Sequence, residues 1–302
     1  MRHPTYAAGV LLLLCSVAVA PARAQDWEAV EIETIDVAPG VYMLVGRGGN
    51  IGVSAGEDGI FLVDDQYAPL TDKIVAALRA ISDAPIRFVI NTHWHGDHTG
   101  GNENLGEIGT LIVAHENVRK RMTVEQFIEA IGDTVPPAPE GALPVVTFTD
   151  AVTFHLNGDD IRVFHVEHAH TDGDAVIHFP GADVIHAGDV YFNGTYPFID
   201  VSSGGSIDGT IAAVDAILAI AGENTRIIPG HGPLSNRTEL AAYRDMLRGT
   251  RDAVAAAIRQ GKSLDEVVAA KPTAKWDAQW GGGFIAPERF VRGLFGDLSR
   301  ER

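Results

Sequence analysis

The chain has 302 residues, of which 46% are hydrophobic and 21% charged, and its formal net charge is −17. This excess of acidic residues disfavours nucleic acid and anionic membrane surfaces as partners, and the hydrophobic content is too high for a disordered chain. The length is sufficient to bury the core of one large α/β domain.

The first 24 residues have the pattern of a secretory signal peptide. Arg2 precedes an apolar run at 7–20, and Ala22-Arg23-Ala24 matches a small-x-small cleavage site. The run has 14 residues, fewer than the roughly 20 that a membrane span needs. We therefore predict export to the periplasm, a mature chain that begins at Gln25, and no membrane insertion after processing.

Processing would also remove Cys15, the only cysteine of the chain. Leu14 disfavours lipid attachment at this cysteine, because a small residue is expected before a lipidated one. The mature protein would then have neither a disulfide nor a thiolate ligand for a metal. Loss of Arg2 and Arg23 changes the formal charge from −17 to −19.

The first half of the chain is predicted to contain strands and a few helices. Residues 31–65 alternate short apolar runs with glycine turns, which indicates antiparallel hairpins. Apolar residues at helical spacing predict a helix over 71–81, with Thr71 or Asp72 as its N-cap. The following elements are expected to be a buried strand at 86–91, a strand at 109–115 and a helix over 116–131.

The pattern starts again after a proline-rich surface loop at 134–144. We expect two strands within 146–167, short strands at 175–180, 183–189 and 226–232, helices over 208–220 and 237–260, and a capping box at 263–266. This order fits two sheets stacked face to face and covered by helices outside. We predict a single domain over 25–302, with a helical C-terminal extension from about residue 236.

Three histidines and an aspartate lie together in the sequence "HWHGDH", directly after the buried strand at 86–91. His93 and His95 alternate with Trp94, so in an extended segment they point to the same side. The glycine that follows lets the chain turn, and Asp97 and His98 then approach from another direction. Neutral imidazole suits zinc, copper or iron, and a carboxylate adds an anionic oxygen ligand. The motif therefore predicts a metal site.

With three later motifs, this sequence resembles the metallo-β-lactamase-fold hydrolases. These motifs are "HAHTDGD" at 168–174, "HAGD" at 186–189 and "IIPGHG" at 227–232, and the likeness covers about residues 40–235. It implies an α/β (α+β) fold, a four-layer αββα sandwich with the metals at one edge of the sheets. It further implies His93, His95 and His170 as ligands of a first zinc, Asp97, His98 and His231 as ligands of a second, and Asp189 as a bridging carboxylate.

Several neighbouring residues allow two interpretations. His168 is the rival of His170 for the third position. Asp64 and Asp65 either orient a ligand histidine or end a strand. Tyr191 and Tyr196, like the stretch "WGGGF" at 280–284, belong either to a pocket wall or to the core. The other histidines are predicted to be packed or on the surface; they are His115, His155, His165, His178 and His186.

The resemblance implies two Zn²⁺ per chain, with iron or manganese as alternatives. Two such ions, about 3.5–4 Å apart, can share a water and lower its pKa toward about 7, so that hydroxide forms near neutral pH. This metal-bound hydroxide would attack the carbonyl carbon of a small-molecule substrate. Asp97, the predicted catalytic residue, would hold the water and pass its proton on.

The predicted substrate is a cyclic amide or ester, with a β-lactam first because such antibiotics act in the cell envelope. Asp189 and Phe192 argue against one lactamase subclass, which has a cysteine and a lysine at the corresponding positions. A lactonase or a thioesterase of the glyoxalase II type is therefore the alternative. A mononuclear iron oxygenase similar to the persulfide dioxygenases comes last. The oligomeric state is not predicted.

Overall fold

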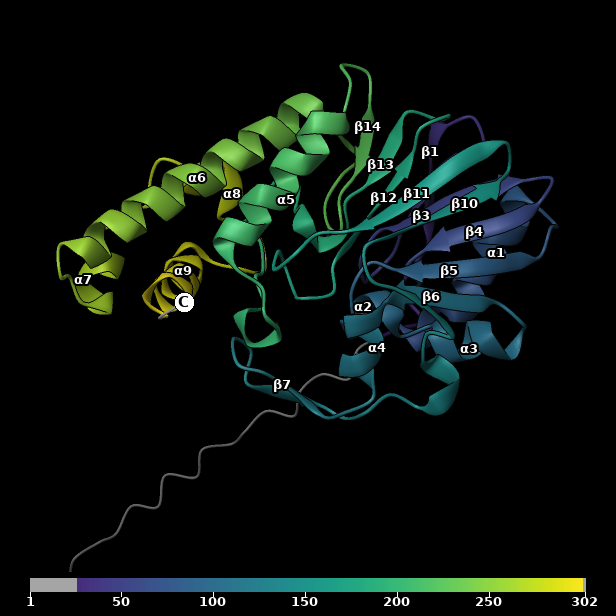
Figure 1. Cartoon of the computed structure of the whole chain (residues 1–302), viewed down its shortest axis with the longest axis horizontal. Coiled ribbons are helices and arrows are strands. Elements are labelled where there is room, and N and C mark those ends of the chain that lie inside the picture. Colours follow the sequence, from purple (N-terminus) through teal and green to yellow (C-terminus); the bar gives the residue numbers. More distant parts are fainter. Residues whose placement is uncertain (1–25, 301–302) are drawn as a thin grey trace, which may run out of the picture.

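The computed structural model describes residues 26–300, and the predicted signal peptide, residues 1–24, lies outside them. Two β-sheets lie face to face and helices cover the outer face of each, as Figure 1 shows. This arrangement confirms the predicted αββα sandwich. Within residues 26–300, no helix has both the length and the apolar character that a bilayer span requires.

The first sheet has seven strands. Its order is β1 (Glu33–Ala38), β2 (Val41–Val45), β3 (Ile51–Gly56), β4 (Gly59–Val63), β5 (Ile86–Asn91), β6 (Leu111–His115) and β9 (Val146–Phe148). The pairs from β1 to β4 are antiparallel, as the glycine turns predict, and the pairs from β4 to β9 are parallel. In β4, Phe61 and Val63 point into the core between the sheets, while Ile60 and Leu62 pack under the outer helices.

The outer face of this sheet is covered by α1 (Thr71–Ile81) and α3 (Asn102–Glu107), which bury Ile74, Leu78 and Leu105. The helix over 71–81 is confirmed, but its predicted cap is wrong. The N-cap residue is Leu70, which makes no side-chain cap. The reason is the 3₁₀ turn η1 (Ala68–Leu70), which runs directly into the helix, so that Thr71 donates its backbone N–H to Ala68 O.

The second sheet has six strands. Its order is β10 (Ala151–Leu156), β11 (Asp159–His165), β12 (Ala175–Phe179), β13 (Val184–His186), β14 (Arg226–Ile228) and β15 (Ser235–Asn236). Its pairs are antiparallel except β13 with β14, which are joined by a crossover through α5 (Ile207–Ile220). Ile177 and Phe179 of β12 face the first sheet and complete the central core.

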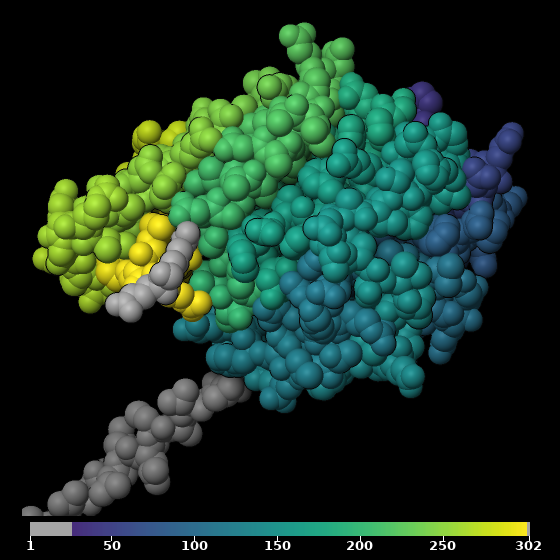
Figure 2. All heavy atoms as spheres, viewed as in Figure 1, coloured from purple at the N-terminus to yellow at the C-terminus, as the bar shows by residue number. Residues whose placement is uncertain are grey.

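The second outer layer consists of α5 with the C-terminal helices α6 (Arg237–Arg259), α7 (Leu264–Ala269), α8 (Asp277–Trp280) and α9 (Pro287–Ser299). Figure 2 shows this layer, green to yellow, at the end of the molecule opposite the N-terminal hairpins. The predicted capping box is present, because Ser263 and Glu266 bond each other's backbone N–H. The side chains of three aromatic residues are buried in this layer, namely Tyr191, Tyr196 and Trp280. These residues therefore belong to the core and not to a pocket wall.

The helix predicted over 116–131 is wrong in its second half. Helix α4 (Glu116–Met122) ends early, and β7 (Gln126–Ile128) and β8 (Asp133–Val135) form a hairpin instead. Only Ile128 of the later apolar residues is buried, beside Trp94, whereas Phe127 is 58% exposed. The helical spacing of these apolar residues therefore does not correspond to one buried face.

Candidate metal centre

The predicted ligands all lie at one edge of the two sheets, where several strands end. His93 and His95 follow β5, and the short helix α2 (Gly96–Thr99) carries Asp97 and His98. The remaining residues come from the second sheet: His170 between β11 and β12, Asp189 in the turn η3 (Gly188–Val190) after β13, and His231 after β14. The fold thus brings all seven predicted residues together.

The first cluster consists of His93, His95 and His170, which are all buried. His95 Nδ1 lies 3.1 Å from His93 Nε2 and 2.8 Å from His170 Nε2, so three ring nitrogens converge on one point. The rival residue His168 is exposed, and its Nδ1 bonds Gly204 O instead. His170 is therefore the residue that joins the cluster.

The second cluster consists of Asp97, His98 and His231. Asp97 Oδ2 lies 3.3 Å from His231 Nε2 and 3.7 Å from His98 Nε2, and the two imidazole nitrogens are 3.4 Å apart. The side chains of Asp97 and His231 are 24% and 30% exposed, so this cluster faces solvent, whereas the first cluster is enclosed.

Asp189 lies between the two clusters. Its Oδ2 is 3.6 Å from His170 Nε2, while its Oδ1 is 3.1 Å from His98 Nε2 and 3.4 Å from His231 Nε2. The buried Oδ1 makes no hydrogen bond of acceptable geometry to any described residue. A carboxylate with one oxygen toward each cluster, one of them lacking a donor, has the geometry of a bridging metal ligand.

Buried acceptors fix the orientation of the imidazole rings. Asp64 accepts hydrogen bonds from Thr92 N and Oγ1 at 2.7 and 2.8 Å, and its Oδ2 lies 2.7 Å from His98 Nδ1. Asp64 therefore orients a candidate ligand. Asp65 does not: its Oδ1 accepts a hydrogen bond from Gly101 N instead.

Asp200 is a functional candidate that the sequence reasoning missed. Its Oδ2 lies 3.1 Å from His95 Nε2, so His95 turns Nδ1 toward the first cluster. Phe198 O similarly accepts a hydrogen bond from His170 Nδ1 at 2.8 Å. Such partners hold ring orientation and tautomer in metal sites. Neither residue belongs to a histidine motif, and only the fold brings Asp200 to a residue 105 positions away.

The charges of the second cluster favour cations. Burial disfavours a charged imidazole at His98, but the nearby carboxylates, Asp189 first, raise its pKa well above the usual value. Burial also opposes charge on His231, whose pKa the carboxylates of Asp189 and Asp97 raise to about 9. Burial raises the pKa of Asp97, but His98 and His231 outweigh it and lower this pKa to about 2. The carboxylates thus draw positive charge onto the imidazoles.

In the first cluster, the surroundings of His93 oppose a positive charge on its imidazole. Burial and the imidazoles of His98 and His170 hold the pKa of His93 well below its usual value, so its ring is neutral. Neutral imidazole is the form that coordinates metals. The converging ring nitrogens with the neutral ring of His93, a bridging carboxylate and a second cluster that attracts positive charge together fit a pair of divalent ions such as zinc.

The remaining histidines within residues 26–300 lie outside the two clusters. His186 is fully buried, and its Nε2 lies 3.0 Å from Asn50 O, as expected for a packed residue. His115 and His165 stack with ring centroids 3.8 Å apart, and His155 pairs with Asp160 on the surface. These positions agree with the predicted packing and surface roles.

Comparison with known proteins identifies the family. A family model described as the metallo-beta-lactamase superfamily matches residues 44–233, more than half of the chain. The chain belongs to the metallo-β-lactamase superfamily. This confirms the resemblance found in the histidine motifs, and it makes the chain a member of a superfamily of metal-dependent hydrolases.

The chain is similar to curated relatives with different activities. It is 25% identical over 236 residues to a linear primary-alkylsulfatase of Pseudomonas sp. (strain ATCC 19151), which is 66% of this chain and 44% of the relative. It is 30% identical over 108 residues to a hydroxyacylglutathione hydrolase of Erythrobacter litoralis, 35% of each chain. It is 25% identical over 162 residues to a type 2 metallo-beta-lactamase of Bacteroides fragilis, 53% of this chain and 58% of the relative. The chain thus spans less than two thirds of the length of each of these three relatives.

Solved structures show the same fold. A metallo-beta-lactamase from Pontibacter korlensis matches with a TM-score of 0.59 and 18% identity, over 72% of this chain and 99% of that protein. A sec-alkylsulfatase from Pseudomonas sp. matches with a TM-score of 0.64 and 17% identity, over 87% of this chain and 50% of that protein. At such identities the matches establish the sandwich and leave the substrate open.

Proposed function

We propose that the chain is an exported, dinuclear zinc hydrolase that cleaves a small-molecule substrate at a carbonyl group. The observation that carries this proposal is the position of Asp189, which directs Oδ2 toward the first cluster and Oδ1 toward the second. A mononuclear iron centre of the oxygenase type would have no use for the second cluster. The paired clusters therefore favour hydrolysis.

Two divalent ions bound at these clusters would polarise the carbonyl and lower the pKa of a shared water. The chain's own residues supply the rest. Asp97 is partly exposed, and its pKa of about 2 keeps it ionised, so its carboxylate can accept a hydrogen bond from an entering water. We assign it the role of proton acceptor because of this position at the open cluster. Asp64 and Asp200 hold His98 and His95 in position, so the rings need not reorganise during turnover.

One observation favours an acyl ester, lactone or thioester over a β-lactam. Phe192 stacks on the His231 ring, with centroids 5.1 Å apart and planes at 16°. An aromatic ring therefore lies where the resembling lactamase subclass offers a lysine to the drug's carboxylate. A β-lactam remains the second candidate substrate, supported by the predicted export and by the similarity to a type 2 metallo-beta-lactamase.

Export rests on the first 24 residues of the sequence. Expression of the full chain in a Gram-negative host should yield a periplasmic protein whose N-terminal residue is Gln25, as read by intact-mass spectrometry. Recovery of the uncleaved chain from the cytoplasm would contradict export and leave the hydrolase proposal unaffected.

The substrate class is tested with a hydrolysis panel on the zinc-loaded protein. The panel contains a p-nitrophenyl acyl ester, an acyl lactone, an acyl thioester, a cephalosporin and a carbapenem, together with an alkyl sulfate because of the alkylsulfatase relative. We expect turnover of the acyl esters, sensitive to chelation and lost in Asp97→Ala. His168→Ala is the matched control, since this histidine lies outside both clusters. Absence of turnover on every carbonyl substrate would overturn the proposal.

A further inference from the structure

Asn50, directly before β3, holds the loop that carries His231. Its side-chain Nδ2 donates hydrogen bonds to Pro229 O and Gly232 O, each at 2.9 Å, so both amide hydrogens are used. Its backbone N donates to Gly230 O at 2.7 Å. Asn50 is buried, with 3% of its surface exposed, so these bonds are shielded from water. The three hydrogen bonds thus fix the loop on both sides of the histidine.

These hydrogen bonds connect the two sheets. Asn50 lies in the turn between β2 and β3 of the first sheet, whereas His231 follows β14 of the second. Asn50 O also accepts a hydrogen bond from His186 Nε2 in β13 at 3.0 Å. His186 Nδ1 in turn accepts one from Gly188 N, the residue before Asp189. One residue of the first sheet therefore contacts both β13 and the loop after β14.

Gly49, the residue before Asn50, contacts the other half of the second cluster. Its backbone N donates to Asp97 O at 3.0 Å, and a Cβ atom added to it would lie 2.1 Å from His98 Cε1. Since Asp64 lies 2.7 Å from His98 Nδ1 and orients the ring, only glycine fits here without displacing it. The turn therefore also fixes the two members of the cluster that come from the first sheet.

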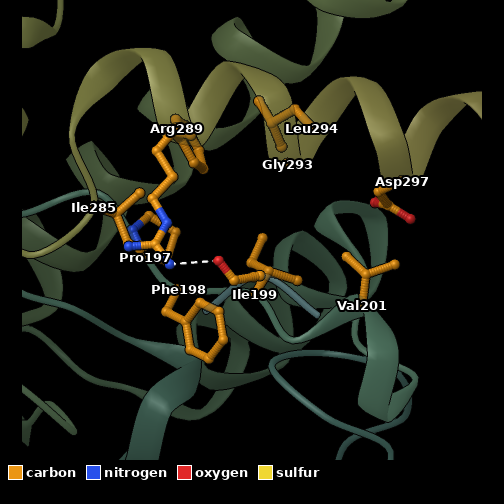
Figure 3. Close-up of a pocket in the computed structure, with 11 residues that line it drawn as sticks. Pro197, Phe198, Ile199, Val201, Ile285, Arg289, Gly293, Leu294 and Asp297 are labelled. Carbon is orange, nitrogen blue, oxygen red and sulfur yellow. Dashed lines mark hydrogen bonds between the residues drawn. The ribbon is translucent and has the colours of Figure 1, made fainter. Parts of the chain in front are cut away.

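The first cluster has its own contacts between and around the sheets. Ala175 N of β12 donates to Thr92 O, next to His93, at 2.8 Å. Phe198 O accepts a hydrogen bond from His170 Nδ1, and Figure 3 shows Phe198 in a segment that lies alongside α9. These contacts do not involve the turn between β2 and β3. The first cluster can therefore keep its geometry when that turn is disturbed.

We propose that Asn50 is a positioning residue for the second metal ion, and that its amide group decides whether the centre holds two ions or one. The proposal rests on the proposed dinuclear zinc site. Without Nδ2, the carbonyl oxygens of Pro229 and Gly232 lose their donor, and the loop loses its attachment to the first sheet. His231 Nε2 is then no longer held 3.3 Å from Asp97 Oδ2, and the second ion loses a ligand in position.

The test measures both zinc affinities of Asn50→Ala by competition with a chromophoric chelator, and the number of bound ions by elemental analysis. We expect the second ion to bind about 10- to 100-fold more weakly, and the first to stay within about twofold of the wild-type affinity. Asn157→Ala is the matched control. Its Nδ2 also bonds from one sheet to the other, to Ser54 Oγ at 3.1 Å and Gly59 O at 3.0 Å, but near the other end of β3. This variant should be less stable to urea and still bind both ions with wild-type affinity.

Gly49→Ala tests the same turn from its other side and decides the question if Asn50→Ala does not fold. Its Cβ displaces the His98 ring, so the second ion should again bind at least about 10-fold more weakly while the first is retained. Wild-type affinity for the second ion, or an equal loss of both ions, would overturn the proposal. A wild-type chain that binds only one ion would instead refute the proposed function, and this inference with it.

Discussion

Asp200→Asn provides a sharp test of how the first cluster is assembled. Asp200 Oδ1 accepts hydrogen bonds from Ser203 N and Ser202 Oγ, while Oδ2 faces His95 Nε2 at 3.1 Å. Because Ser203 N–H can only donate, the asparagine must keep its carbonyl oxygen there and turn its NH₂ group toward His95. His95 Nε2 would then become an acceptor, and the proton would move to Nδ1, the nitrogen that faces the cluster.

A protonated Nδ1 cannot coordinate a metal, so the variant should bind its first zinc about 10- to 100-fold more weakly, or about 1.4–2.7 kcal/mol. The assay is competition with a chromophoric chelator at fixed pH. Ser202→Ala, which removes one partner of Asp200 without facing His95, should stay within about twofold of the wild-type affinity. An Asp200→Asn protein with wild-type zinc affinity and unchanged unfolding of its metal-free form would refute this role.

Three further predictions follow from the site and its surroundings. Asp97→Ala should lower kcat by about 10²-fold or more with little change in melting temperature, and retained activity would exclude it as the proton acceptor. Zinc binding near pH 7.5 should release protons, because the pKa of about 9 at His231 leaves this residue protonated before it coordinates. The apparent zinc affinity should therefore rise up to about pH 9. Calorimetry in buffers of different ionisation enthalpy measures the number of protons released. Asp65→Asn should stabilise the metal-free protein at neutral pH by about 1–3 kcal/mol, since burial raises the pKa of Asp65 and its Oδ2 has no hydrogen-bond partner among the described residues.

The sign of the Asp65 effect follows from linkage. A carboxyl group whose pKa is raised in the folded state contributes its stability fully below the unfolded pKa of about 3.9, and that contribution is lost as pH rises through the folded value. The increase in the free energy of unfolding caused by Asp65→Asn, measured by urea unfolding, should therefore become larger as pH rises from about 4 toward neutral. An increase that is constant with pH would contradict the titration of Asp65.

Much of the candidate site could be predicted because its residues lie in short motifs at strand ends. His93, His95, Asp97 and His98 are nearly contiguous, and the choice between His168 and His170 needed only the structure of one loop. The partner of His95 could not be predicted in this way. Asp200 has no motif around it, and its role depends on tertiary contacts between segments far apart in the sequence.

In the fold, too, features that depend on local residues could be predicted and features that depend on tertiary packing could not. Alternating strands and the capping box of α7 depend on local residues, and the structure agrees with them. The helix predicted after Met122 is wrong because Val124 and Phe127 have helical spacing but remain 54% and 58% exposed. Periodicity identifies a helix only when the periodic face is buried by something else in the fold.

The most direct test of the central claim is the metal content of the purified chain after reconstitution. Elemental analysis should find two zinc ions per chain in the wild-type protein, and clearly fewer in Asp189→Ala, because Asp189 faces both clusters. His168→Ala should retain both ions. A single iron ion per chain, or two zinc ions held equally well without Asp189, would contradict the dinuclear site from which the proposed chemistry follows.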